Sequence, residues 1–212
     1  MMSQVDQTFH VYQQKLATLK TDGPKLIAIA GPPGSGKSTL ADELSQRFNQ
    51  VQAGSCQVIP MDGWHYDNAL LQELGLKGRK GSPESFDVQG LIDLFKRIKK
   101  RQHSIAVPLF YRDLDVSRGS ARFIHPKTQI LLVEGNYLLL NRPGWKEMHS
   151  LFDLTSMLEV PMDVLQKRLL ERWANLPEDL AQQKIAANDL PNARLVIEHS
   201  RPADFTISLP AS

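Results

Sequence analysis

The chain has 212 residues, which is enough for one domain with a well-covered core. Hydrophobic residues make up 42% and charged residues 23% of it, and these ordinary proportions exclude a disordered chain, a collagen-like repeat and a disulfide-rich scaffold. The 25 Lys and Arg residues nearly balance the 23 Asp and Glu residues, so the net charge of +2 excludes the broad basic surface of general nucleic-acid or membrane binders. Any anionic partner must be bound at a local site.

Apolar residues at steps of four and three predict an amphipathic helix over about residues 4–20. Its apolar positions are Val5, Phe9, Tyr12, Leu16 and Leu19. We expect this helix to dock on the core, with binding of a partner as the alternative.

Short apolar runs alternate with amphipathic stretches along the rest of the chain. Strands are predicted at residues 25–30, 56–61, 104–110, 121–124, 129–133, 154–160 and 205–209. Helices are predicted at residues 35–48, 69–74, from a cap at residue 85 or 87 to about residue 101, and at 163–176, 177–188 and 192–199. Strands separated by helices favour an α/β fold in one domain over residues 1–212, with a parallel sheet covered on both faces.

The single cysteine and the N-terminal segment favour a cytoplasmic location. Cys56 cannot form a disulfide within the chain and lies in an apolar run, so we expect a buried, unreactive thiol in a reducing compartment. No run approaches about 18 consecutive apolar residues, and the first residues lack the pattern of a signal peptide.

The strongest motif follows the first predicted strand. Its residues are Gly31, Pro32, Pro33, Gly34, Ser35, Gly36, Lys37, Ser38 and Thr39. A glycine, four further residues and then Gly-Lys-Ser, placed between a strand and a helix, predict a phosphate-binding loop. Glycines let backbone amides point at phosphate oxygens, Lys37 can bridge the outer phosphates, and the Ser38 hydroxyl can ligate Mg²⁺.

Two acidic residues end predicted strands at the edge where a parallel sheet binds ligands. Asp62, which we expect beside the phosphate-binding loop, could take a proton from a hydroxyl that attacks a terminal phosphate; the alternative is a loop-capping side chain. Glu134 could hold Mg²⁺ directly or through water, and the alternative is a helix cap or a salt bridge. A metal site made by Asp62, His65 and Asp67 is disfavoured, because these residues match no structural zinc pattern.

Arg168 and Arg172 are four residues apart on a predicted helix and therefore share a face. Two guanidinium groups on one face could clamp phosphates and neutralise charge in a transition state. From the spacing alone, surface ion pairs are the favoured interpretation.

Four segments occur in a characteristic order and spacing. They are GPPGSGKST at residues 31–39, MDGWH at 61–65, RKGSPESFD at 79–87 and VEGNY at 133–137. Together they resemble the uridine kinase, pantothenate kinase and phosphoribulokinase group of P-loop kinases, over about residues 25–209, and most closely the small bacterial members labelled as uridine or fructose-transport-associated kinases. The resemblance implies a three-layer α/β/α P-loop NTPase fold of the kinase type with a mainly parallel sheet and a small lid. It also implies transfer of the γ-phosphoryl group of ATP to a hydroxyl of a small molecule.

The resemblance assigns roles to single residues. Lys37 and Ser38 match the phosphate-binding lysine and the magnesium-binding serine. Asp62 matches the catalytic aspartate, and Glu134 matches the acidic residue near magnesium. Arg168 and Arg172 match the arginines of the lid helix. Acceptor-binding groups are expected at His65, Tyr66, Arg79, Phe86, Asp87 and Tyr111, with Arg112 and Arg118 as weaker candidates; most of them lie in an insertion over about residues 63–87. Residues 188–193 resemble a family motif near the base of the nucleotide.

One segment departs from the uridine kinases. Where these enzymes carry an Asp and then a His that reads the pyrimidine, this chain has Arg112 and Val116. We expect Arg112 to pair with Asp113 or Asp115, with contact to an anionic acceptor as the alternative.

The resemblance therefore implies an enzyme that uses ATP and Mg²⁺ and phosphorylates a nucleoside. A sugar kinase, a pantothenate kinase and a nucleotide-dependent regulatory switch are the alternatives. The expected partners are ATP and a small acceptor, without nucleic acid or membrane, and formation of a homodimer is left open.

Overall fold

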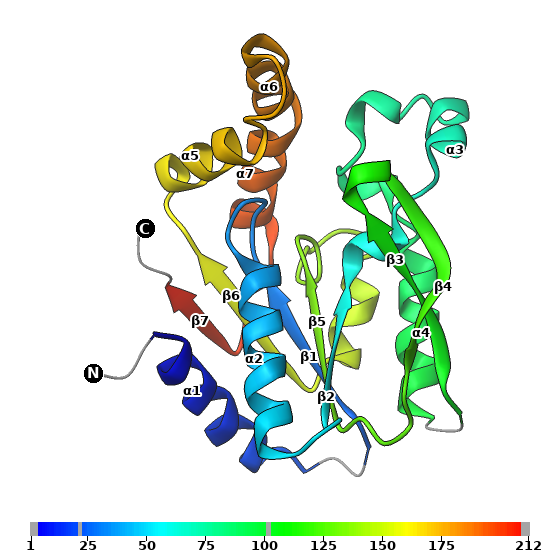
Figure 1. Ribbon diagram of the computed structural model, residues 1–212, viewed down its shortest axis with the longest axis vertical. Coiled ribbons are helices and arrows are strands. Elements are labelled where there is room, and N and C mark those ends of the chain that lie inside the picture. Colours follow the sequence, from blue (N-terminus) through cyan, green and yellow to red (C-terminus); the bar gives the residue numbers. More distant parts are fainter. Residues whose placement is uncertain (1–3, 21–22, 101–102, 209–212) are drawn as a thin grey trace.

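The structure is a computed structural model that describes residues 4–20, 23–100 and 103–208. Its central element is a sheet with the strand order β2-β5-β1-β6-β7 (Figure 1). These strands are β1 (Lys25–Ala30), β2 (Cys56–Pro60), β5 (Ile130–Gly135), β6 (Leu154–Glu159) and β7 (Phe205–Ser208). Every pairing between neighbours in this sheet is parallel, which confirms the predicted α/β class.

Helices cover both faces of the sheet (Figure 1). They are α1 (Gln4–Thr18), α2 (Lys37–Val51), α3 (Asn68–Glu73), α4 (Val88–Lys99), α5 (Met162–Arg172), α6 (Glu178–Lys184) and α7 (Leu190–His199). Side chains of β1 alternate between two apolar clusters, as successive strand residues must. Ile27 and Ile29 belong to the cluster with α1 and α2, whereas Leu26 and Ala28 belong to the cluster with α4 and α7. The predicted three layers are therefore confirmed.

The N-terminal helix α1 docks on the core, as expected. Tyr12 is fully buried, and its hydroxyl oxygen lies 2.6 Å from Oγ of Ser156 in β6. Phe9 packs edge-on against Phe48 of α2, with ring centroids 4.8 Å apart. Within the described ranges, no helix has the length and apolar character needed to cross a membrane.

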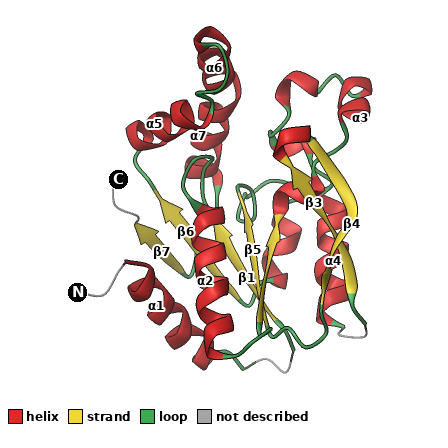
Figure 2. Cartoon of the chain, in the orientation of Figure 1, coloured by secondary structure: helices red, strands yellow, loops and turns green. Residues whose placement is uncertain are grey.

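A second, antiparallel sheet is a hairpin beside the main sheet (Figure 2). Its strands are β3 (Ile105–Tyr111) and β4 (Val116–Ile124), joined through a 3₁₀ turn at Arg112–Leu114. The predicted start of the second strand at residue 121 is therefore wrong, because β4 begins at Val116. Ser117 and Arg118 pair with β3 although their side chains are polar, because an exposed strand does not need apolar residues.

The C-terminal helices also differ from the prediction. α5 ends at Arg172, and α6 continues into α7 through a π-helical segment at Ile185–Asp189. The sequence predicted a break before residue 192, because Pro191 lacks an N–H group and normally interrupts a helix. The structure accommodates this proline in the first turn of α7, directly after the widened π-helical turn. Residues 101 and 209, the predicted ends of a helix and a strand, lie outside the described residues.

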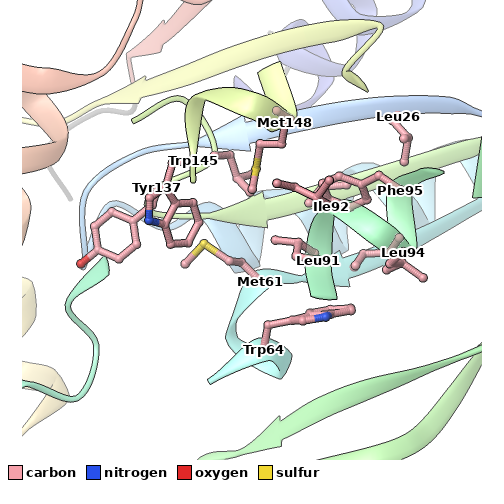
Figure 3. Packing of buried hydrophobic residues seen from close by; sticks show 14 of the residues in the cluster. Leu26, Met61, Trp64, Leu91, Ile92, Leu94, Phe95, Tyr137, Trp145 and Met148 are labelled. Carbon is pink, nitrogen blue, oxygen red and sulfur yellow. The ribbon is translucent and has the colours of Figure 1, made fainter. Parts of the chain in front are cut away.

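Aromatic rings fill the core between the sheet and α4 (Figure 3). Trp64 and Trp145 are buried there. Tyr137, Phe86 and Trp145 contact one another edge-on, with ring centroids 5.2 to 5.8 Å apart. Cys56 lies in the cluster on the other face of the sheet, where burial raises the pKa of its thiol to about 12, in agreement with an unreactive cysteine.

The end of β5 leaves no room for a side chain at Gly135, where a Cβ atom would lie 2.5 Å from Cβ of Met61. We expect Gly135→Ala to lower the free energy of unfolding by about 1–3 kcal/mol, because the neighbouring chain must shift to relieve the overlap. Gly78→Ala is the control, since a Cβ atom there has no heavy atom within 4 Å. Urea denaturation compares the two variants, and an equal loss of stability in both would contradict this account.

Candidate active site

Three strand ends lie side by side at the carboxyl edge of the sheet. β1 leads into the phosphate-binding loop, and β2 leads into the 3₁₀ helix Met61–Trp64, which carries Asp62. β5 lies between them, so that Glu134 is the direct neighbour of Ile29 in β1 and of Pro60 in β2. The strand that leads to Asp62 is thus not the direct neighbour of β1, because β5 lies between the two strands and places Glu134 between them.

The phosphate-binding loop folds as the motif predicts. Gly34 and Gly36 have φ angles of 80° and 91°, in the left-handed region that glycine adopts without strain. Gly36 begins α2, whose first turn contains Lys37, Ser38 and Thr39. Gly31, Pro32, Pro33 and Ser35 are buried, whereas Ser38 and Thr39 are exposed. The loop thus directs the amide end of α2 toward solvent at the sheet edge, which is where a phosphate group can bind.

The ammonium group of Lys37 is held inside this loop. Its Nζ donates to the carbonyl oxygen of Pro32 at 2.9 Å and to Oγ of Ser35 at 3.4 Å. Burial lowers the pKa of Lys37 to about 8, although the carboxylates of Glu134 and Asp62 oppose the shift. Lys37, Glu134 and Asp62 are therefore close enough to form one electrostatic group.

Glu134 and Ser38 provide a pair of oxygen ligands. The pKa of Glu134 is raised to about 7, with burial as the largest cause and the charge of Asp62 as the second, whereas Lys37 and a hydrogen bond with Ser38 oppose the rise. A hydroxyl and a carboxylate beside a phosphate site are the ligands that Mg²⁺ prefers, with phosphate oxygens and water completing its shell. The two side chains therefore fit a magnesium ion that accompanies a nucleotide.

His65 and Asp67, which would form the disfavoured metal site together with Asp62, have other partners in the structure. Nδ1 of His65 lies 2.9 Å from the backbone oxygen of Asp62, and the side chain of Asp67 caps α3 by accepting from the amide of Ala69. Among the residues that the structure describes, no three His, Cys, Asp or Glu side chains are grouped so as to hold a metal ion.

Asp62 forms an ion pair that the sequence did not predict. Nη2 of Arg112 donates to Oδ2 of Asp62 at 2.8 Å, and the side chains are 53% and 24% exposed. The expected pairing of Arg112 with Asp113 or Asp115 is therefore wrong. Asp115 instead pairs with Lys80 at 3.0 Å.

The hairpin brings Arg112 to Asp62 because it packs on the turn that contains this acid. Oγ of Ser117 donates to the carbonyl oxygen of Gly63. A side chain at Gly63 would collide with the hairpin, since a Cβ atom there would lie 2.6 Å from the carbonyl oxygen of Pro108. Glycine at position 63 thus permits the contact that places Arg112 at the site.

The predicted acceptor-binding residues differ in exposure: Phe86 is buried, whereas the others are half-buried or exposed. The His65 ring stacks between Phe86 and Phe110, at centroid distances of 4.0 and 4.8 Å, and burial lowers its pKa. Phe86 is 3% exposed and belongs to the core. Asp87 caps α4 by accepting from the amide of Gly90. His65 and Phe86 thus pack against other rings and Asp87 caps a helix, although Phe86 and Asp87 also line a surface cleft.

Tyr66, Arg79 and Tyr111 are more accessible. Tyr66 and Asp87 line a surface cleft of about 360 Å³ together with Arg142 and Trp145. Arg79 is exposed in the short 3₁₀ helix Lys77–Arg79. Tyr111 is 39% exposed, and the guanidinium of Arg118 lies over its ring at 4.8 Å.

Tyr137, Asn188 and Asn192 hold the loop at residues 79–85, which is called the acceptor loop below because the resemblance implies acceptor-binding groups there. Sequence reasoning did not assign these three residues this role. The hydroxyl of Tyr137 donates to the carbonyl oxygen of Gly81 at 2.6 Å. Nδ2 of Asn188 donates to the carbonyl oxygen of Lys80 at 2.7 Å, and Nδ2 of Asn192 to that of Gly81 at 3.3 Å. The segment 188–193 was expected near the base of the nucleotide, whereas these contacts are with the acceptor loop. The four-residue spacing of the two asparagines was the available signal.

Helix α5 lies over the phosphate-binding loop (Figure 1). Nη1 of Arg168 donates to the carbonyl oxygen of Ser35 at 3.4 Å, and a Cβ atom at Gly34 would lie 3.3 Å from Cγ of Leu169. The guanidinium of Arg172 lies over the ring of Trp173, 5.3 Å from its centroid. The structure therefore brings the first lid arginine to the loop and the second to a tryptophan.

This arrangement of loop, carboxylates and lid defines a P-loop nucleotide-binding protein. A family model described as "AAA domain" matches residues 27–188. "Putative uridine kinase C227.14" of Schizosaccharomyces pombe is 32% identical over 93% of this chain and 88% of its own length. The pantothenate kinase of Enterococcus faecalis is 34% identical over 72% of this chain, which spans 50% of the length of that relative. The crystal structure of a "putative fructose transport system kinase" from Silicibacter sp. TM1040 is 38% identical, with a TM-score of 0.89 over 98% of this chain and 100% of the other.

The chain belongs to the P-loop kinases of the uridine kinase and pantothenate kinase group. This membership confirms the family and the kinase-type fold that the four sequence segments predicted. It also implies use of ATP, usually with Mg²⁺.

The contacts of Asn188 predict a role in ordering the acceptor loop. We expect Asn188→Ala to accelerate hydrogen exchange in residues 79–85, because the carbonyl of Lys80 loses a buried donor. Gln182→Ala is the control, since Gln182 is exposed on α6 and bonds with Glu178 of the same helix. Unchanged exchange in residues 79–85 of Asn188→Ala would rule out this role.

Proposed function

We propose that the protein transfers the γ-phosphoryl group of ATP to a hydroxyl of a small metabolite. The observation that carries this proposal is the shared environment of three side chains. The charge of Asp62 raises the pKa of both Lys37 and Glu134, and all three residues lie at the sheet edge at the phosphate-binding loop. Phosphate-binding groups and a proton acceptor at one place are what phosphoryl transfer requires.

Each group has a part in this proposal. Backbone amides at the start of α2 and the ammonium of Lys37 bind the phosphates, and Ser38 and Glu134 hold the metal ion. Mg²⁺, when bound, neutralises charge on the phosphate oxygens. Arg168 and Arg172 on α5 stabilise negative charge on the transferred group, with Arg168 already at the loop through Ser35.

Asp62 acts as the general base. It takes the proton of the acceptor hydroxyl as the hydroxyl oxygen forms a bond to the γ-phosphorus. The bond from that phosphorus to the oxygen bridging it to the β-phosphate breaks, and ADP leaves with its electron pair. A phosphate ester of the acceptor and one proton on Asp62 result.

The acceptor expected from the resemblance is a nucleoside, with a sugar or pantothenate as alternatives. Position 116, where uridine kinases carry the pyrimidine-reading histidine, is a valine that pairs with Tyr111 in the hairpin. These candidates also differ in charge, because pantothenate carries a carboxylate whereas nucleosides and sugars are neutral at pH 7. The guanidinium of Arg112 beside Asp62 makes that difference relevant to the choice of acceptor.

The regulatory switch considered above was motivated in part by the N-terminal helix. Tyr12 of this helix is fully buried against the core, and Leu16 is 9% exposed. Much of its apolar face is thus already occupied within the chain, and the enzymatic proposal is favoured.

The proposed base predicts a separation of binding from turnover. We expect Asp62→Asn to retain ATP binding but to lose about 10²- to 10⁴-fold in acceptor-dependent ADP release, because the amide cannot accept the proton. ADP release is followed with nucleosides, sugars and pantothenate as acceptors. Asp93→Asn on the exposed surface of α4 is the control. Wild-type turnover by Asp62→Asn would contradict the assignment of the base.

A further inference from the structure

We propose that Arg112 recognises an anionic acceptor. The carboxylate or phosphate group of this acceptor replaces Asp62 as the ion-pair partner of the Arg112 guanidinium. The inference rests on the proposed function, because it assigns the acceptor class of the same site. It is carried by the position of Arg112, a cation from a hairpin distant in the sequence that pairs with the proposed general base, Asp62, at 2.8 Å.

The hairpin tip is fastened while the side chain of Arg112 remains half exposed. Asp115, three residues further along, pairs with Lys80 at 3.0 Å and accepts from Nδ2 of Asn68 at 3.0 Å. Ser117 donates to the carbonyl oxygen of Gly63. The backbone that carries Arg112 is thus fixed beside the site, and its 53% exposed side chain is accessible to a ligand from solvent.

Neighbouring acids on the acceptor side have partners of their own. Asp115 is matched by Lys80, Glu84 lies 3.6 Å from Arg142, and Asp87 accepts from the amide of Gly90. Arg112 thus pairs with none of these acids but with Asp62, the residue that accepts a proton in the proposed reaction.

A neutral and an anionic acceptor have different consequences for this ion pair. With a neutral acceptor there are two possibilities. Either the ion pair between Asp62 and Arg112 breaks and Arg112 gains no new anionic partner, or Asp62 accepts the proton while Arg112 still neutralises its charge. An anionic compound replaces one carboxylate partner with another, and the planar guanidinium binds carboxylate and phosphate groups through two parallel N–H donors. Partly exposed ion pairs are weak, so this exchange meets little resistance.

The contact between Asp62 and Arg112 also limits the shape of the acceptor. The reacting hydroxyl must reach Asp62 while the anionic group of the same compound reaches Arg112. These two side chains are in direct contact in the structure. This geometry favours compact hydroxy acids and sugar phosphates.

The test compares acceptors in pairs that differ in charge. The pairs are glycerol with glycerate, ribose with ribose 5-phosphate, fructose with fructose 6-phosphate, and pantothenol with pantothenate, and uridine is included as a neutral nucleoside. We expect the best substrate to be the anionic member of a pair, with kcat/KM about 10- to 100-fold above that of its neutral counterpart. Comparison of the carboxylate and phosphate pairs identifies which anion is preferred.

Variants at position 112 connect this preference to the guanidinium. Arg112→Gln should reduce the ratio between anionic and neutral acceptors by about 10- to 100-fold, mainly through KM, and Arg112→Lys should retain part of it. Arg97→Gln removes an exposed arginine from α4 and should leave the ratio unchanged. If Arg112→Gln instead lowers kcat equally for charged and neutral acceptors, Arg112 acts on the transferred phosphoryl group and the proposal is overturned. A neutral best acceptor overturns it as well.

Binding measurements separate this proposal from the kinase proposal. Calorimetry with the protein in the presence of ADP and Mg²⁺ measures the same pairs without turnover. We expect each anion to bind the wild type at least about tenfold more tightly than its neutral partner, and we expect Arg112→Gln to lose this difference. Such binding supports the anion site even if no acceptor is phosphorylated. Absence of phosphorylation in that case contradicts only the proposed function. Turnover without a charge preference that depends on Arg112 contradicts only the anion site. Absence of both turnover and selective anion binding overturns both proposals.

Discussion

The parallel register of β2, β5 and β1 brings charged groups of both signs to one buried edge of the sheet. Glu134 lies between the strand that leads to Lys37 and the strand that leads to Asp62. Burial favours the neutral forms of Glu134 and Lys37, and the attraction between these two residues opposes both shifts. Holding such charges away from water is costly, and perturbed groups of this kind are concentrated at functional sites. The other elements of the site are arranged around this group.

Two peripheral units reach the charged group from different ends of the sheet edge (Figure 1). The hairpin β3–β4 approaches from the side of β2 and is fastened to the turn that contains Asp62. Helices α5 to α7 follow β6 and contact the phosphate-binding loop through Arg168 and the acceptor loop through Asn188. One helical unit therefore contacts both loops.

The parts of the site that depend on local sequence were predictable, and the parts that depend on tertiary packing were not. The strand, glycine-rich turn and helix around Lys37 follow from consecutive residues, and so does Asp62 at the end of a strand. Arg112 was assigned to acids beside it in the chain, because a sequence offers no measure of proximity to a residue 50 positions away. The contacts of Asn188 were missed for the same reason. β4 was underestimated because its polar side chains conceal a strand that is stabilised by backbone pairing.

The docking of α1 extends the support of the phosphate-binding loop beyond the sheet. The hydroxyl of Tyr12 forms a hydrogen bond with Oγ of Ser156, which donates to the backbone oxygen of Ala28. Ala28 lies three residues before Gly31, where the phosphate-binding loop begins. Tyr12 is fully buried, so loss of this helix would open a hole the size of an aromatic ring beneath β1 and leave Ser156 without its outer partner. The smallest unit that keeps the loop in its present shape therefore begins before β1, within the N-terminal helix.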